Sequence, residues 1–152
     1  RLTGGPPTHI DSHHHAHRLF NVAWQFLEAG ARYHCPVRGF SEVFFVGRFW
    51  GQPELGRTDV TKISTDYLLT ILKSLGPGVS EVSCHPGRME ARRDAQYNRE
   101  REVELQSLCD AKVKADIAAE GIRLISYREY GHLASTTARR MLASGCRPTA
   151  SR

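Results

Sequence analysis

Short apolar runs alternate with amphipathic segments of helical period along most of this chain, and this alternation constrains the fold more than any other feature. The apolar runs are short and bounded by turn residues, as strands are. The helical segments are expected to start at the capping residues Asn21, Thr65, Asn98 and Asp110, with Gly30 and Gly121 as stops. We therefore predict an α/β domain with mostly parallel strands and outer helices. Strands are expected over residues 8–13, 33–37, 43–46, 79–84 and 122–125, and helices over 21–30, 65–75, 98–108 and 110–120.

The basic charge of the chain is concentrated at its end. The net charge is +5, but residues 131–152 hold four arginines and no acidic residue. Residues 1–130 therefore carry 17 basic against 16 acidic side chains. A basic tail alone is a poor electrostatic footprint for nucleic acid, so we expect no nucleic-acid partner. The tail has no sustained apolar stripe, and we expect a weak helix at best, followed by a frayed end.

Composition excludes two further classes of protein. No stretch of about 18 apolar residues is present, so no membrane span is expected. The four cysteines lie far apart without a CxxC pair, which argues against a zinc knuckle or a dense disulfide framework. Residue 1 is Arg and no signal peptide is readable. These observations favour a cytoplasmic protein with reduced thiols.

A histidine-rich segment is the first candidate site. Five of the eight histidines fall within residues 8–17, THIDSHHHAH. On an extended backbone, alternate residues share one side, so His13 and His15 would face the same way and His14 the other. Imidazole is a common metal ligand and a nearby carboxylate can orient it. The segment therefore predicts part of a metal site; the alternative is a solvated polar loop.

Two other features suggest a site at strand ends. His85 follows a predicted strand and precedes Pro86-Gly87, a position that suits a general acid or base; it could equally satisfy loop backbone groups. Trp50 and Gln52 lie in a long loop where they could contact a sugar, although a tryptophan beside phenylalanines is more often core. The Arg- and Glu-rich run at 99–104 is expected to be a solvated helix face.

These motifs together resemble one family. The segment PTHIDSHHHAH at residues 7–17 is similar to the central motif of the YdjC-like carbohydrate deacetylases, which include the ChbG- and HpnK-type proteins. FWGQ at 49–52 and the helix, strand and HPG motif at 63–87 resemble the same family. Residues 94–110 and 121–129 resemble its C-terminal end. We therefore expect a partial deacetylase domain over residues 1–130 and a separate tail over 131–152.

The resemblance implies a (β/α) barrel-like fold and a divalent-metal-dependent hydrolase that removes acetyl groups from N-acetylated sugars. It implies that His13, with His15 beside it, binds the metal, Mg²⁺ or Zn²⁺. It implies that His85 protonates the departing amine. The candidate substrate contacts are Asp11, Trp50 and Gln52.

The chain also departs from the family pattern. The family's paired-aspartate motif and Gly-Leu-His-Leu segment, which supply the base and further metal ligands, are absent from these 152 residues. Arg88 stands where an aromatic residue usually follows HPG. We therefore expect the C-terminal half of the family domain. The alternatives are a non-catalytic metal- or carbohydrate-binding module, and a fragment without function. An open sheet edge of such a half-domain could also pair two copies of the chain into a homodimer.

Overall fold

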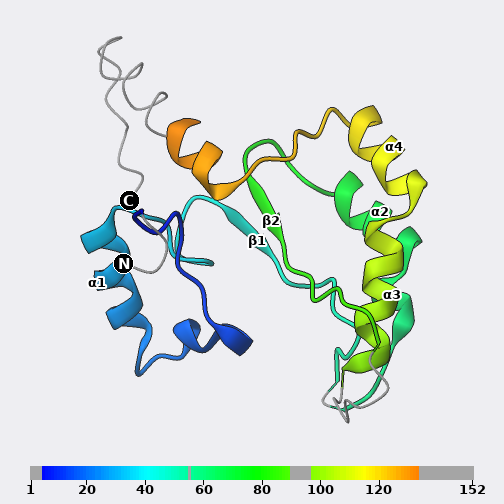
Figure 1. Ribbon diagram of the computed structural model, residues 1–152, viewed down its shortest axis with the longest axis horizontal. Helices are drawn as coiled ribbons and strands as arrows, with labels where there is room; N and C mark the ends of the chain where they lie inside the picture. The colour runs from blue at the N-terminus through cyan, green and yellow to red at the C-terminus, as the bar shows by residue number, and fades with distance from the viewer. Residues whose placement is uncertain (1–4, 55, 90–96, 134–152) are drawn as a thin grey trace. The chain divides into compact units, whose positions relative to one another are not determined.

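The computed structural model describes residues 5–54, 56–89 and 97–133, which fall into two compact units (Figure 1). One unit is Arg1–Ser41 with Leu124–Arg152, and the other is Glu42–Arg123. Each is considered by itself below. The first contains the 3-10 segment η1 (His13–Arg18) and the helix α1 (Ala23–Tyr33). The second contains β1 (Phe44–Val46), η2 (Val60–Ile63), α2 (Thr65–Lys73), β2 (Ser80–Val82), α3 (Asn98–Leu108) and α4 (Ala111–Ala119).

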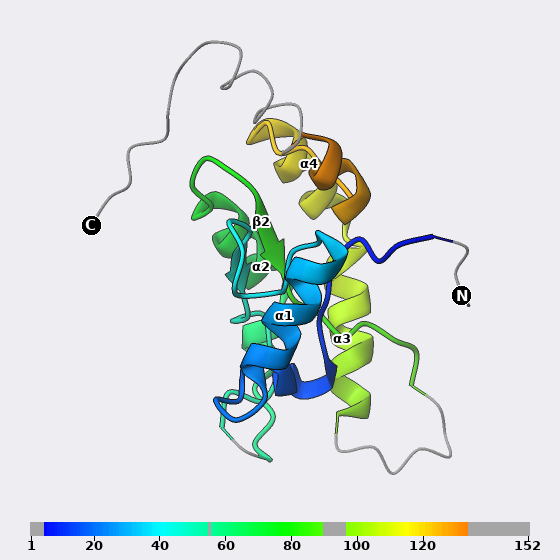
Figure 2. The ribbon, with the colours of Figure 1, turned by 90° about the vertical axis from the view of Figure 1, so that its left-hand side faces the viewer.

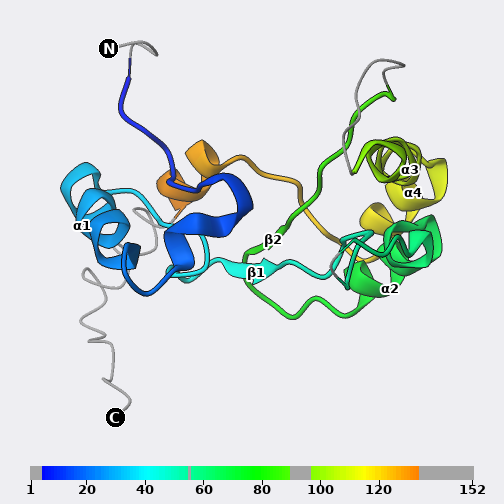
Figure 3. The ribbon, with the colours of Figure 1, turned by 90° about the horizontal axis from the view of Figure 1, so that it is seen from below.

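The second unit is built on a parallel strand pair. Strands β1 and β2 pair in parallel with Phe44 opposite Ser80 and Val46 opposite Val82. Figure 3 shows the two strands side by side, with the three helices α2, α3 and α4 gathered together. Because parallel neighbours need a crossover, α2 lies on the connection between them. The predicted α/β class with parallel strands is confirmed, although both strands are shorter than expected. Closure into a barrel stays a prediction.

Helix α2 supplies much of the core of this unit. Its residues Leu68, Ile71 and Leu72 are buried against Phe49 and other apolar side chains. The predicted cap was wrong by one residue: the Ser64 hydroxyl accepts a hydrogen bond from the Tyr67 N–H, 3.2 Å away. Thr65, predicted as the cap, is instead the first helical residue and donates its hydroxyl to Asp110. The remaining members of the core cluster are Val46, Ile63 and Val113.

The end of this unit follows its local sequence with one exception. Helix α3 begins at Asn98 as a helical residue, with Tyr97 at the capping position. Asp110 caps α4 as predicted, accepting from the Lys112 N–H at 2.9 Å. Gly121 ends α4 with a φ of +65°. The predicted strand at 122–125 is wrong: the segment is irregular and Leu124 is 74% exposed. The helical turns at 127–133 belong to the first unit, and the rest of the predicted tail lies outside the described residues.

The first unit differs most from expectation. The predicted strands at 8–13 and 33–37 shrink to one isolated parallel bridge between Ile10 and Val37. Helix α1 includes the first residue of the second predicted strand, because it continues through Gly30 to Tyr33 (Figure 2). His34 follows it in the left-handed region at φ 52°. Gly30 was predicted to stop the helix. It is buried instead, where an added Cβ would lie 2.7 Å from Val37 Cγ2.

Two smaller expectations concern α1 and the thiols. Asn21 does not cap α1; Val22 holds that position without a side-chain hydrogen bond. Cys35, Cys84 and Cys109 are thiols rather than disulfides, and burial raises the pKa of the Cys35 thiol. In the portion of the chain that the structure describes, no helix is both long and apolar enough to cross a bilayer.

Candidate functional site

Three aromatic rings meet in the second unit where the chain leaves the strands. The Trp50 ring stacks on the Tyr97 ring with centroids 4.0 Å apart and planes 6° apart. The His85 imidazole lies edge-on to Trp50 at 5.0 Å and to Tyr97 at 6.2 Å. Trp50 follows β1 and His85 follows β2, so both come after the carboxyl ends of parallel strands. The structure thus brings two of the predicted site residues together. Trp50 is half-buried and His85 exposed.

The buried face of α3 is acidic, which corrects the prediction of a solvated helix face. Glu104 is fully buried and Glu100 is 3% exposed. Glu104 accepts hydrogen bonds from the backbone N–H of His85 and, at 2.5 Å, from the Tyr97 hydroxyl. The Tyr97 oxygen in turn accepts from the Gly51 N–H at 2.7 Å. These bonds tie the segments that carry Trp50 and His85 to one helix.

Glu100 binds two side chains of the loop that follows Trp50. The Gln52 side-chain amide donates to Glu100 Oε1 at 2.9 Å, and the Thr58 hydroxyl donates to the same oxygen. Burial opposes the charged form, but these hydrogen bonds outweigh it and hold the pKa of Glu100 below its ordinary value. Burial, helped by the hydrogen bond to Glu104, raises the pKa of Tyr97 above its usual range, so its hydroxyl remains a donor.

The glycine of the HPG motif lies against the same helix. The Gly87 N–H donates to the Arg101 carbonyl at 3.0 Å. A Cβ at residue 87 would lie 2.5 Å from the Arg101 guanidinium, so only glycine fits this close approach without a shift. The loop after β2 is therefore held to α3 at two backbone positions, 85 and 87.

The histidine segment in the first unit does not have the predicted geometry. His14 and His15 lie in η1 with φ of 51° and 55°, so the backbone is left-handed there and the expected alternation of a strand is wrong. His13 is exposed, with its ring 4.1 Å from that of His14, and His15 is half-buried. Their role as metal ligands stays a prediction.

His17 has a structural role instead. It is fully buried, with Nδ1 2.8 Å from the Ser12 hydroxyl and Nε2 3.0 Å from the Arg38 carbonyl. Both ring nitrogens are thus engaged by the protein. Asp11, the predicted substrate contact, forms an ion pair with Arg38 at 2.8 Å, and His9 stacks on Tyr127 at 4.1 Å. Within residues 5–54, 56–89 and 97–133, no group of three or more His, Cys, Asp or Glu side chains could hold a metal ion.

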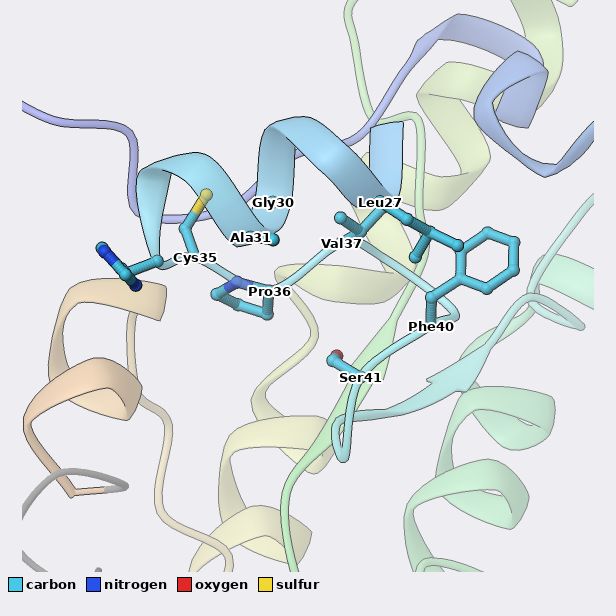
Figure 4. Close-up of a pocket in the computed structure, with 9 residues that line it drawn as sticks. Leu27, Gly30, Ala31, Cys35, Pro36, Val37, Phe40 and Ser41 are labelled. Atoms are coloured by element: carbon cyan, nitrogen blue, oxygen red, sulfur yellow. The ribbon is translucent and has the colours of Figure 1, made fainter. Parts of the chain in front are cut away.

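A pocket beside α1 lies apart from the predicted site residues of this unit. Its volume is about 320 Å³, and Figure 4 shows Leu27, Gly30 and Ala31 of the helix facing Val37 and Phe40. Neither Asp11 nor His13 nor His15 lines it. The pocket therefore offers no support for placing the chemistry there.

Sequence reasoning missed Tyr97, Glu100 and Glu104 as members of the site. A signal was present: these three residues and the buried Ser107 recur at spacings of three and four, which places them on one helical stripe. A stripe of polar residues that is buried must face other polar groups. Here those groups belong to the loops after β1 and β2.

Comparisons with known proteins identify the family of this chain. The family model for YdjC-like proteins matches residues 1–119. The chain belongs to the YdjC-like family. A carbohydrate deacetylase of Geobacillus stearothermophilus is 32% identical over 140 residues, covering 84% of this chain and 53% of the relative. One from Vibrio parahaemolyticus is 30% identical over 132 residues, covering 79% and 49%.

A solved structure shares the fold of this YdjC-like chain. It is a crystal structure from Enterococcus faecalis V583, described as that of a cellobiose-phosphate cleavage protein. The match has a TM-score of 0.68 and 25% sequence identity, and it covers 84% of this chain and 54% of the other. The chain thus spans about half the length of the relatives that it matches.

Proposed function

We propose that this chain takes part in the hydrolytic removal of acetyl groups from N-acetylated sugars. The observation that carries the proposal is the His85 imidazole beside Trp50, with both residues held through α3 after the ends of parallel strands. Relatives at 30–32% identity named carbohydrate deacetylase support the same class of reaction.

In this reaction, water loses a proton to a general base and adds its oxygen to the acetamide carbon, the carbon–nitrogen bond breaks, and acetate and a free amine are formed. The resemblance assigns that base to the paired-aspartate motif, which these 152 residues lack. We assign to His85 the proton that the leaving nitrogen needs, because its imidazole is exposed and histidine is the side chain that most often serves as a general acid. Trp50 offers an apolar ring for a sugar face. Gln52 would orient the sugar, but its amide nitrogen already donates to Glu100, so it acts from a fixed position.

We propose that His13 and His15 bind a divalent metal, with Asp11 close by as a substrate contact. Such an ion, when bound, polarises the acetamide carbonyl and lowers the pKa of its water. Two imidazoles favour Zn²⁺ over Mg²⁺. A catalytic zinc normally has three protein ligands, and among the described residues no group of three donors exists. These residues fit part of a metal site, and no catalytic step is assigned to the ion.

Acetate release from N-acetylglucosamine oligomers tests the proposal. The chain is assayed with Mg²⁺, Zn²⁺ or EDTA, beside His13→Ala and His85→Ala, with His14→Ala as the matched control. Metal-dependent release that both test variants lose and the control keeps would support the proposal. Absence of release by the folded chain under every condition would contradict the assignment of activity to this chain.

A second candidate is a binding module without catalysis. The stacked pair of Trp50 and Tyr97 favours it, since such a platform binds sugars without any metal. Calorimetry with the same oligomers separates the two: binding that Trp50→Ala removes, without acetate release, supports the module. The cytoplasmic location stays a prediction. The pairing of two copies through the sheet edge also stays a prediction, and sedimentation equilibrium would test it.

A further inference from the structure

Glu104 lies where two loops from different strands meet one helix. The loop after β1 contains Gly51, and the loop after β2 contains His85. Both contact α3 through a single carboxylate: the His85 N–H bonds Oε2, and the Tyr97 hydroxyl, which accepts from Gly51, bonds Oε1. One continuous hydrogen-bond path thus runs from Gly51 through Tyr97 and Glu104 to His85.

The burial of this carboxylate is costly for the fold. The side chain is fully buried, and a charge taken out of water must recover its hydration through its partners. Among the described residues, the hydrogen bonds that Glu104 accepts come from neutral donors, a backbone N–H and a phenol. An apolar side chain at this position would leave the His85 N–H and the Tyr97 hydroxyl without this acceptor. The carboxylate therefore holds both donors in place.

We infer that Glu104 is a positioning residue that sets the backbone of His85 and, through Tyr97, the ring of Trp50. With both oxygens engaged, the carboxylate fixes the distance between the two loops as well as the direction of each. This inference depends on the proposed function only for the role of His85 as proton donor. The positioning itself is a property of the free chain and is measurable without substrate.

Backbone amide NMR on the ¹⁵N-labelled chain tests the inference. An N–H that donates to a carboxylate is strongly deshielded, and a neutral amide is a weaker acceptor. We expect the His85 and Gly51 amide protons to move upfield in Glu104→Gln. Glu102→Gln, which removes an equal charge from the same helix, should leave both in place. In Tyr97→Phe, the Gly51 proton should move and the His85 proton should not.

Near-UV circular dichroism gives a second readout, because the Trp50–Tyr97 stack holds two rings in a chiral arrangement. We expect Glu104→Gln to weaken that signal with its far-UV spectrum unchanged. Wild-type positions of the His85 amide in Glu104→Gln, or an equal shift in Glu102→Gln, would overturn the inference.

A measurement on the unmodified chain decides the matter if Glu104→Gln does not fold. A scalar coupling across the hydrogen bond from His85 N to the Glu104 carboxyl carbon is expected, and its absence would overturn the inference. Loss of acetate release in Glu104→Gln, taken alone, neither supports nor overturns the positioning role. If no acetate is released but the NMR pattern holds, the proposed function is wrong and the positioning role stands.

Discussion

At the scale of single residues, backbone propensity and packing can oppose one another, and Gly30 is such a position. Glycine inside a helix costs about 1 kcal/mol relative to alanine. Yet an added Cβ at Gly30 would lie 2.7 Å from Val37 Cγ2 and 3.1 Å from the Cys35 carbonyl oxygen. The close approach of α1 to the following segment requires the absence of a side chain.

Gly30→Ala is therefore expected to destabilise the chain. Overpacking costs about 1–3 kcal/mol, and the middle of this range exceeds the gain of about 1 kcal/mol in helix propensity. Urea unfolding should show a net loss of about 1 kcal/mol by this difference. The control is Gly131→Ala, in the helical turns at 127–133, where a Cβ would meet nothing within 4 Å. An equal effect of the two substitutions would contradict the packing argument.

Some residues of the candidate site could be predicted from the sequence and others could not. His85 and Trp50 were predicted from their places beside strands, and the structure brings their rings within 5.0 Å. Glu100 and Glu104 were missed because a charged residue on a helix is usually solvated. Their burial depends on donors from loops distant in sequence, such as the His85 N–H and the Thr58 hydroxyl, which no local pattern contains.

At the scale of elements, helices were predicted better than strands. A helix is set by local periodicity and caps, so α3 and α4 begin and end within a residue or so of expectation. A strand needs a partner from elsewhere in the chain. The apolar run at 122–125 has the composition of a strand but is irregular in the structure. The histidine segment was misjudged for a related reason, since its left-handed residues end any extended run.

Helix α2 allows a test of the cap that the structure assigns. Ser64→Ala removes the acceptor of the Tyr67 N–H and should lower the free energy of unfolding by about 1 kcal/mol. Ser64→Asp should keep most of the stability, because aspartate is an equally good cap and favours the positive end of the helix dipole. Urea denaturation measures both. Equal losses in the two variants would show that the hydroxyl does not cap α2.

At the scale of the whole molecule, acid stability reflects the buried network. The pKa of Glu100 is lower in the folded chain than its ordinary value, which approximates the unfolded chain. The stabilisation from its charge is therefore present above the unfolded pKa, about 4.3, and is lost as pH falls through the folded pKa.

Glu100→Gln should flatten this acid dependence. Unfolding by urea, followed between pH 7 and about pH 3, should show the stability advantage of the wild type shrinking as pH falls. Glu102→Gln, on the same helix, is the control for removing one negative charge and should keep the wild-type acid dependence. A constant difference between wild type and Glu100→Gln at all pH values would contradict the assignment.

The parallel pairing of Phe44 with Ser80 also sets an order of events in time. Helices α2 and α3 can form from local contacts, whereas the two strands must wait for the whole crossover to close. Trp50 meets His85 and Tyr97 only after that closure, because both come from later parts of the chain. In stopped-flow refolding, the helical signal should therefore appear before the Trp50 fluorescence change, with Trp24→Phe used to isolate the latter. The chemistry proposed for His85 would be the last property that a newly made chain acquires.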